Sequence, residues 1–525
     1  MTSPSQKVPS SRPVAAFARR RSTPLAAAAV VLGAACTSMV MAQSAPATSP
    51  VIQAGPVNLT FGGFSELATI YRSKDESADV GSSFNGIPMA NTEQSNVSEF
   101  RESARQSRLS ILAQTQDMGG YKAETWFEMD FLGAAPTANS NESNSYQPRI
   151  RNIYGRFNSD SGWYLLAGQN WSLVTLEKKG MDPRDENVPL TIDAQYVSGF
   201  NWTRNPQVRL VDKIADGVWL GLSLESPQAT GIVNTNSLAN GGIKGTLPTG
   251  PTTGFAGTGQ LGNGGGTCSA TTTTTTTTTT TGGDTSTSTS TSTTTCSVSG
   301  SSFSTDIAPD IVAKVAVDPG YGHYELYGLA RWFRSEIATS AQTTMGGGVG
   351  AGAILPLIPD VLSFQISGLA GKGIGRYGSA SLNDVVVKPD GQLAPVEAYQ
   401  AMAGLVFTPN PTLQAYLYAG REKQFKTLYQ YGTPTVGPYW FGLGIPNLTN
   451  TGCYVLGGTC SGQNQTVDEV TGGFWWKFYR GPLGNAQFGL QAGYLQRTLF
   501  ESTGGAPVAG MFQGMASFRI YPFQK

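Results

Sequence analysis

The feature that most restricts the fold is a strict alternation of apolar and charged side chains in residues 121–131. One face holds Tyr121, Ala123, Thr125, Phe127, Met129 and Phe131, and the other holds Lys122, Glu124, Trp126, Glu128 and Asp130. Because side chains alternate across a strand, this pattern predicts a strand with one apolar face and one charged face. In a soluble sandwich the charged face points to bulk water, whereas in a membrane barrel it points into a wet lumen.

Tight turns alternate along the chain with long polar segments. Residues 108–115 alternate in the same way as 121–131, and Asp117–Gly120 joins the two segments as a hairpin turn. The long polar segments are 73–103, 133–147, 171–195, 227–305, 374–394 and 423–465. Short turns at one end and long loops at the other are typical of outer-membrane barrels. The sequence therefore predicts an all-β fold, a transmembrane antiparallel β-barrel over residues 56–525.

About 16 strands are expected. The segments are 57–71, 104–116, 121–132, 148–158, 163–170, 196–204, 206–212, 217–226, 307–317, 322–335, 344–355, 361–373, 395–408, 412–422, 466–480, 485–500 and 507–523. We merge 196–204 and 206–212 into one strand interrupted at Pro206, because bacterial single-chain barrels have an even number of strands.

Residues 1–42 are predicted to be a secretory signal peptide. Arg19-Arg20-Arg21 precedes an apolar stretch that ends near Cys36, and small or apolar residues around Ala42 favour cleavage there. Residues 43–55 then form a short linker. After this leader no run of 18 apolar residues remains, so a membrane-spanning helix is not expected.

Composition argues against a nucleic-acid partner. Without the five basic residues of the leader, 30 Lys and Arg stand against 35 Asp and Glu. A basic footprint is therefore absent, and we expect small hydrophilic solutes and outer-membrane lipid as partners. No motif for catalysis or for a cofactor is recognised, so the chain is not predicted to be an enzyme; a hydrolase that uses the single histidine, His323, remains a minor alternative.

A low-complexity insert lies at about 264–300. It contains an unbroken Thr271–Thr281 run and is bounded by Cys268 and Cys296. Such composition predicts a disordered outer loop. In an oxidising compartment the four cysteines after the leader suggest two disulfides, most simply Cys268–Cys296 and Cys453–Cys460, with a metal site as a weaker alternative because no ligand cluster accompanies them.

Charges that recur on one strand face are the candidate pore lining. By strand parity these are Arg108, Lys122, Glu128, Asp130, Arg149, Arg151 and Arg331. Pores select ions through ladders of such side chains, although the same charges can simply pair along the wall. The third outer loop, 171–195, is the candidate constriction loop through Lys178, Lys179 and Arg184, with an ordinary solvated loop as the alternative.

Four blocks resemble the DcaP-like outer-membrane porin family. They are Ala104-Arg105-Gln106-Ser107-Arg108-Leu109, Glu128-Met129-Asp130-Phe131, Arg149-Ile150-Arg151-Asn152 and Ala167-Gly168-Gln169-Asn170-Trp171. The resemblance covers 57–212 and implies a 16-stranded, trimeric porin that often prefers small anions such as dicarboxylates. Residues 43–55 leave no room for the N-terminal coiled coil that members of this family can carry.

These observations favour a passive diffusion porin. The alternative is a barrel-anchored surface or adhesive protein that displays the Thr-rich loop. Sugar uptake is a variant of the first reading, since Trp126 and Tyr327 are placed to stack on sugar rings or are only wall aromatics.

Overall fold

A computed structural model describes residues 50–524, except 77, 134–146, 231–263, 280–286, 302–306, 338–339, 389–391 and 434–435. The predicted leader lies outside the described residues and stays a prediction. In the described part, helices are limited to four short 3-10 turns, η1 (Phe84–Gly86), η2 (Glu93–Asn96), η3 (Gly375–Tyr377) and η4 (Thr451–Tyr454). No described helix is long and apolar enough to cross a membrane.

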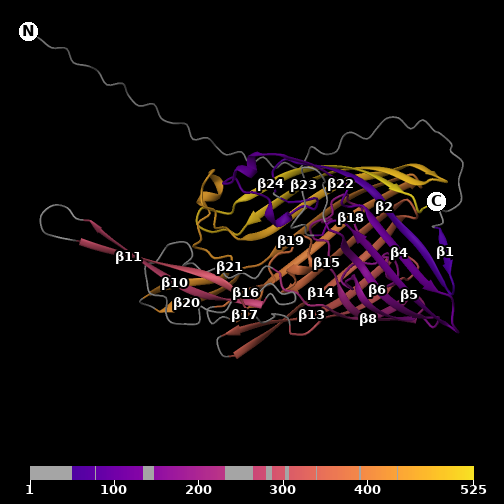
Figure 1. Cartoon of the computed structure of the whole chain (residues 1–525), viewed down its shortest axis with the longest axis horizontal. Coiled ribbons are helices and arrows are strands. Elements are labelled where there is room, and N and C mark those ends of the chain that lie inside the picture. The colour runs from indigo at the N-terminus through magenta and orange to yellow at the C-terminus, as the bar shows by residue number, and fades with distance from the viewer. Residues whose placement is uncertain are drawn as a thin grey trace, which may run out of the picture. The chain divides into compact units, whose positions relative to one another are not determined.

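A closed antiparallel sheet with 16 strand positions forms the body (Figure 1). The strands are β2 (Val57–Arg72), β3 (Glu99–Ser103) with β4 (Arg108–Thr115), β5 (Tyr121–Asp130), β6 (Arg149–Ser159), β7 (Trp163–Trp171), β8 (Arg204–Ala215), β9 (Val218–Glu225), β12 (Asp310–Val317), β13 (His323–Ile337), β14 (Ser340–Ile358), β15 (Leu362–Lys372), β18 (Glu397–Asn410), β19 (Leu413–Gln424), β22 (Asn464–Gly481), β23 (Gly484–Leu499) and β24 (Val508–Tyr521). β3 and β4 share one position because both pair with β2. Pairing of β9 with β12 and of β2 with β24 closes the barrel, so the predicted fold is confirmed.

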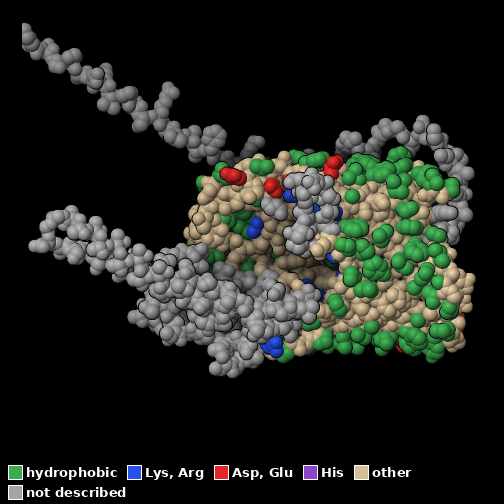
Figure 2. All heavy atoms as spheres, viewed as in Figure 1, with side chains coloured by type: hydrophobic (Ala, Val, Ile, Leu, Met, Phe, Trp, Pro, Cys, Tyr) green, Lys and Arg blue, Asp and Glu red, His purple; other side chains and the backbone are tan. Residues whose placement is uncertain are grey.

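The outer wall is apolar because alternate residues of every strand point outward. Leu222, Leu326 and Leu417 are about half exposed, whereas their neighbours Ser223, Tyr327 and Tyr418 are buried inside. Figure 2 shows hydrophobic side chains spread over the outer surface of the barrel. This wall fits a bilayer, in which each backbone N–H and C=O must be paired within the sheet.

The prediction of a strand over residues 196–204 is wrong. These residues belong to the loop between β7 and β8, and β8 begins at Arg204 and runs through Pro206. Tyr196 and Gly199 have φ of 70° and 84°, which turn the chain in a way that a strand does not allow. The apolar pattern there reflects burial inside the barrel rather than pairing in its wall.

Short elements also occur where linker or loop was expected. β1 (Val51–Ala54) lies within the expected linker and pairs with β2. In the Thr-rich insert, β10 (Gly264–Thr279) pairs with β11 (Thr287–Ser301), in agreement with the β preference of threonine, and the predicted disorder of the insert stays a prediction. Two further hairpins lie in long loops: β16 (Val385–Val387) with β17 (Leu393–Pro395), and β20 (Thr427–Thr433) with β21 (Val436–Leu443).

Candidate functional site

Loop 3, which we define as residues 172–203, enters the lumen and follows its wall. Its backbone N–H groups donate hydrogen bonds to side chains of distant strands. These bonds run from Glu177 to Glu325 (3.0 Å), from Ile192 to Gln491 (2.5 Å), from Ser198 to Glu469 (2.8 Å) and from Gly199 to Glu422 (2.9 Å). The Gly180 N–H reaches Asp318, in the short turn between β12 and β13 (3.1 Å). Loop 3 therefore extends deep into the barrel and divides the lumen.

The first part of loop 3 packs into an apolar region, which we call the packed region. Leu173, Val174 and Met181 contribute from loop 3. The strand residues of the packed region are Tyr154, Tyr164, Leu166, Val211, Val312, Ala316, Tyr327, Leu329, Leu369 and Ala398. All these side chains are buried, so the expectation that inward faces are wet does not hold here.

Two glutamates are enclosed beside the packed region. Glu177 and Glu186 form an isolated antiparallel bridge within loop 3, and both side chains are buried. Burial raises the pKa of Glu177 well above its ordinary value, and the charge of Glu186 adds to this. The nearby Lys314 ammonium is already bound to Glu325 and to the Thr175 carbonyl, each at 2.7 Å. The Glu177 carboxyl is therefore favoured in its protonated form.

A second region, which we call the basic cavity, has a volume of about 510 Å³. The second part of loop 3, from Val188 to Tyr196, lines one side. The wall side comes from β4, β19 and β22–β24 and contributes Arg108, Gln414, Trp475, Lys477, Arg480, Asn485, Gln487, Arg519 and Tyr521. Its lining holds four basic residues against one acid, Asp193, so the formal charge of the lining is positive.

Three arginines surround Tyr196 at the edge of the basic cavity. Arg151 donates to the Tyr196 hydroxyl at 3.3 Å. Burial raises the pKa of Tyr196, but the charges of Arg151, Arg204 and Arg108 outweigh it and leave the pKa below its ordinary value. A site that lowers the pKa of a buried phenol also stabilises a bound anion.

Arg108 and Arg204 are only partly paired by the surrounding protein. The Arg108 Nε and the Arg204 Nε and Nη1 are buried and have no hydrogen-bond partner among the described residues. Aromatic rings hold both guanidinium groups: Arg204 lies 5.2 Å from the Trp171 ring and Arg108 lies 5.4 Å from the Phe64 ring. Such stacking fixes a guanidinium without using its N–H groups.

Four of the predicted pore residues pair with one another. Arg149 binds Asp130 at 2.7 Å, and Arg151 binds both Glu128 and, at 3.1 Å, Asp130. The bulge between Glu128 and Met129 turns Arg151 inward. These contacts agree with wall pairing, which places Arg151 beside Tyr196, and the role of these charges in ion selection stays a prediction.

Arg331 does not line an open lumen as predicted. Its side chain is fully buried and is held by Asp310 at 3.0 Å and Asp384 at 2.9 Å. Lys122 lies instead at the rim, exposed beside Asp117 and Asp160 of the short turns.

The three candidates in the constriction loop are not in the basic cavity. Lys178 and Lys179 are exposed. Arg184 lies against β5, 3.5 Å from Glu124 and 5.4 Å from the Trp126 ring. Both contacts attach the tip of loop 3 to the wall away from the basic cavity.

Sequence reasoning missed Arg204, Arg519, Lys477, Arg480 and Tyr196. The sequence placed Tyr196 and Arg204 in an expected strand over 196–204, whereas Tyr196 lies in loop 3 and Arg204 is the first residue of β8. The alternation Phe518-Arg519-Ile520 carried a usable signal, because outward Phe518 and Ile520 place Arg519 inside. There Arg519 lies between the Phe64 and Trp475 rings, at 4.7 and 4.2 Å, and binds Glu66 at 3.1 Å.

His323 is buried between two carboxylates, with its ring nitrogens 2.6 Å from Asp318 and 3.0 Å from Glu325. Asp318 also accepts the Gly180 N–H, so this histidine belongs to the anchor of loop 3. Of the described residues, no group of three or more His, Cys, Asp or Glu is arranged to hold a metal ion.

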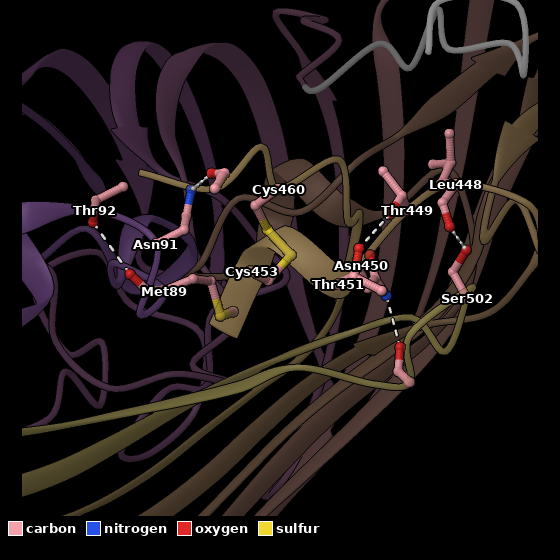
Figure 3. Close-up of a disulfide and its surroundings, with 12 residues drawn as sticks. Met89, Asn91, Thr92, Leu448, Thr449, Asn450, Thr451, Cys453, Cys460 and Ser502 are labelled. Atoms are coloured by element: carbon pink, nitrogen blue, oxygen red, sulfur yellow. Dashed lines mark hydrogen bonds between the residues drawn. A yellow bond between two sulfur atoms is a disulfide. The ribbon is translucent and has the colours of Figure 1, made fainter. Parts of the chain in front are cut away.

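A disulfide stabilises the outer loops above β22–β24. Cys453 and Cys460 are bonded, which confirms this predicted pair (Figure 3). Asn91 of the first outer loop donates to the Gly458 carbonyl within the closed ring at 3.0 Å. Cys453 also packs in one cluster with Phe84 and Met89. The side chains of Cys268 and Cys296 lie outside the described residues, and that pair stays a prediction.

Together, the closed barrel and the inward loop define the fold of the 16-stranded outer-membrane porins. In particular, the structure is similar to the outer membrane channel DcaP of Acinetobacter baumannii, with a TM-score of 0.56 and 17% identity over 88% of this chain and 97% of that one. The predicted resemblance is thereby confirmed for the fold.

Two further solved structures are similar at lower scores. OmpT of Vibrio cholerae has a TM-score of 0.43 and 9% identity, over 90% of this chain and 99% of that one. The anion-selective porin from Comamonas acidovorans has a TM-score of 0.41 and 12% identity, over 89% and 99%. No protein-family model matches the chain, and no curated protein matches its sequence.

Proposed function

We propose that this protein is an outer-membrane porin through which small hydrophilic anions diffuse passively. The observation that carries the proposal is the basic cavity, together with the unused donors of Arg108 and Arg204 beside Tyr196. The packed region excludes solutes from the opposite part of the lumen, so they pass along the basic wall.

Carboxylates suit this wall better than chloride does. A guanidinium group presents parallel N–H donors that match a carboxylate in a bidentate way. Arg108 lines the basic cavity beside Tyr196, so one carboxylate of a dicarboxylate is placed to engage it while the other carboxylate remains in the cavity. Small dicarboxylates are therefore the proposed preferred solutes.

The remaining parts of the proposal concern location and assembly. Residues 1–42 direct export and are removed, the apolar wall sits in outer-membrane lipid, and three copies associate through their barrels. The fold and its apolar outer surface support the membrane location; cross-linking of the purified protein tests the trimer.

Reversal potential in a planar bilayer under a KCl gradient tests the function. We expect an anion-selective native pore and at least about a tenfold lower anion/cation permeability ratio in R108Q/R204Q, since each unit charge at about 10 Å contributes about 1.7 kcal/mol at an effective dielectric constant of about 20. The control E177Q lies in loop 3 outside the basic cavity and should keep the native ratio. A native protein that forms no channels contradicts the proposal.

A further inference from the structure

A group of basic side chains lies on the outward face of the barrel, apart from the lumen. On β19, Arg421 and Lys423 have the parity of Leu417, which is 51% exposed and points outward. Lys372, at the end of β15, has the parity of the outward Ile366. Lys426 is exposed just beyond the end of β19.

The register places these residues side by side. Lys372 is opposite Glu397, and Tyr399 is opposite Lys423 on the next strand. Neighbouring strands are about 4.8 Å apart, so Lys372 and Lys423 lie about 10 Å apart across β18, and Lys426 follows in the loop beyond β19, beside Gly444. By contrast, the outward positions of β4, β5, β6, β9, β12, β23 and β24 carry no basic residue in the described chain.

The depth of this surface is that of lipid headgroups. It lies at the strand ends that carry the long loops, directly beyond the outward apolar residues Leu417 and Val470. Lysine facing lipid costs about 2–4 kcal/mol at the midplane of the bilayer but almost nothing at its surface. Tyr399 and Phe425, with ring centroids 6.1 Å apart, add aromatic rings of the kind found at membrane interfaces.

The charge balance favours an anionic partner. Asp468 is occupied by its ion pair with Arg421. Lys423 faces Tyr399 on one side and Thr466 on the other, and its ammonium lies 5.5 Å from the Phe425 ring. The surface thus has four basic residues, Lys372, Arg421, Lys423 and Lys426, against two acidic ones, Glu397 and Asp468. Its net charge at the outer leaflet is positive.

We propose that Lys372, Lys423 and Lys426 bind the phosphate groups of a phosphorylated glycolipid in the outer leaflet. The aromatic pair Tyr399 and Phe425 contacts the sugar and upper acyl region of the same lipid. Each lysine near an anionic lipid surface contributes about fivefold in affinity, which corresponds to about 1 kcal/mol. The surface therefore fixes a lipid on the wall without taking part in solute passage.

Native mass spectrometry of the full protein with bisphosphorylated lipid A in detergent tests this. We expect K372Q/K423Q/K426Q to bind about 100-fold more weakly, because three such contributions are lost. This variant keeps the Arg421–Asp468 pair. The control K122Q/K178Q/K179Q removes three positive charges elsewhere and should bind lipid A like the native protein. Dephosphorylated lipid A is the second control, and it should bind the native protein and both variants equally weakly.

Native affinity in the K372Q/K423Q/K426Q variant, or equal binding of the dephosphorylated lipid by the native protein, overturns the proposal. If the variant has a different number of subunits but native lipid affinity, the three lysines form a contact between subunits. That result also overturns the proposal. Reversal potentials of the same samples separate this result from the porin function, because the three lysines lie outside the lumen and their loss should leave selectivity unchanged.

Discussion

The packed region and the basic cavity lie in one barrel and are both covered by loop 3, but they differ in what the wall presents. In the packed region the wall presents Leu166, Val312 and Leu369 to an apolar stretch of the loop. In the basic cavity it presents Arg108, Lys477 and Arg519. The inward side chains thus decide where the loop binds by apolar contact and where space remains for solute.

The difference shows that a barrel lumen need not be uniformly wet. Burial of apolar side chains inside the barrel stabilises loop 3, much as a core stabilises a soluble domain. The first part of the loop is thereby held in the packed region, and we propose that selectivity depends on the basic wall.

The largest effect is expected from the packed region itself. Leu173→Ala removes a fully buried side chain and should lower the local stability of loop 3 by about 2–5 kcal/mol. Leu190→Ala, in the half-buried lining of the basic cavity, should cost less than about 1.5 kcal/mol, because water can fill the space. Hydrogen exchange of the loop amides measures both. Equal costs would remove the distinction between the two regions.

The pH dependence of loop 3 sharpens the comparison. Burial raises the pKa of Glu177 in the folded protein, so the native state favours the protonated carboxyl. The stability that protonated Glu177 gives to folded loop 3 is fully present below the ordinary pKa of glutamate. This stability is lost as the pH rises through the raised pKa, at up to about 1.4 kcal/mol for each pH unit. We expect exchange of amides 173–181 to accelerate with rising pH beyond its intrinsic increase.

Glu177→Gln is the matched variant, because it keeps the shape of the protonated side chain and cannot ionise. Its loop 3 should keep constant protection over the same pH range. Protection in the native protein that does not change with pH would contradict the buried state of Glu177.

The smallest effect is expected from Lys178 and Lys179, the residues that the sequence favoured for the constriction. Both are exposed and lie outside the basic cavity, and exposed charges contribute less than about 1 kcal/mol. K178Q/K179Q should therefore change the anion/cation permeability ratio by less than about fivefold. A change as large as that of R108Q/R204Q would place the solute path beside the tip of loop 3.

The sequence predicted the wall better than the contents of the lumen. Alternation identified the strands, because outward residues such as Leu222 and Leu326 meet lipid and cannot be exchanged with inward ones. The same alternation placed Arg108 and Arg151 inside. It also placed Arg331 inside, but parity gives no information on Asp310 and Asp384, whose contacts enclose it.

The path of loop 3 could not be predicted for a related reason. Its anchors Glu325, Gln491, Glu469 and Glu422 are on strands far away in the chain, and nothing local indicates these pairings. The alternation of Tyr196, Ser198 and Phe200 resembled a strand because a buried loop also needs apolar residues. The left-handed φ of Tyr196 became visible only in three dimensions.

Cysteine accessibility tests the central claim that solutes pass through the basic cavity and not through the packed region. We would add an anionic thiol reagent to planar-bilayer channels of Q487C, in the lining of the cavity, and of V312C, in the packed region, with the native protein as control. The account predicts that the reagent lowers anion current through Q487C and leaves V312C and the native channel unchanged. Rapid modification and block of V312C, with Q487C unaffected, would contradict it.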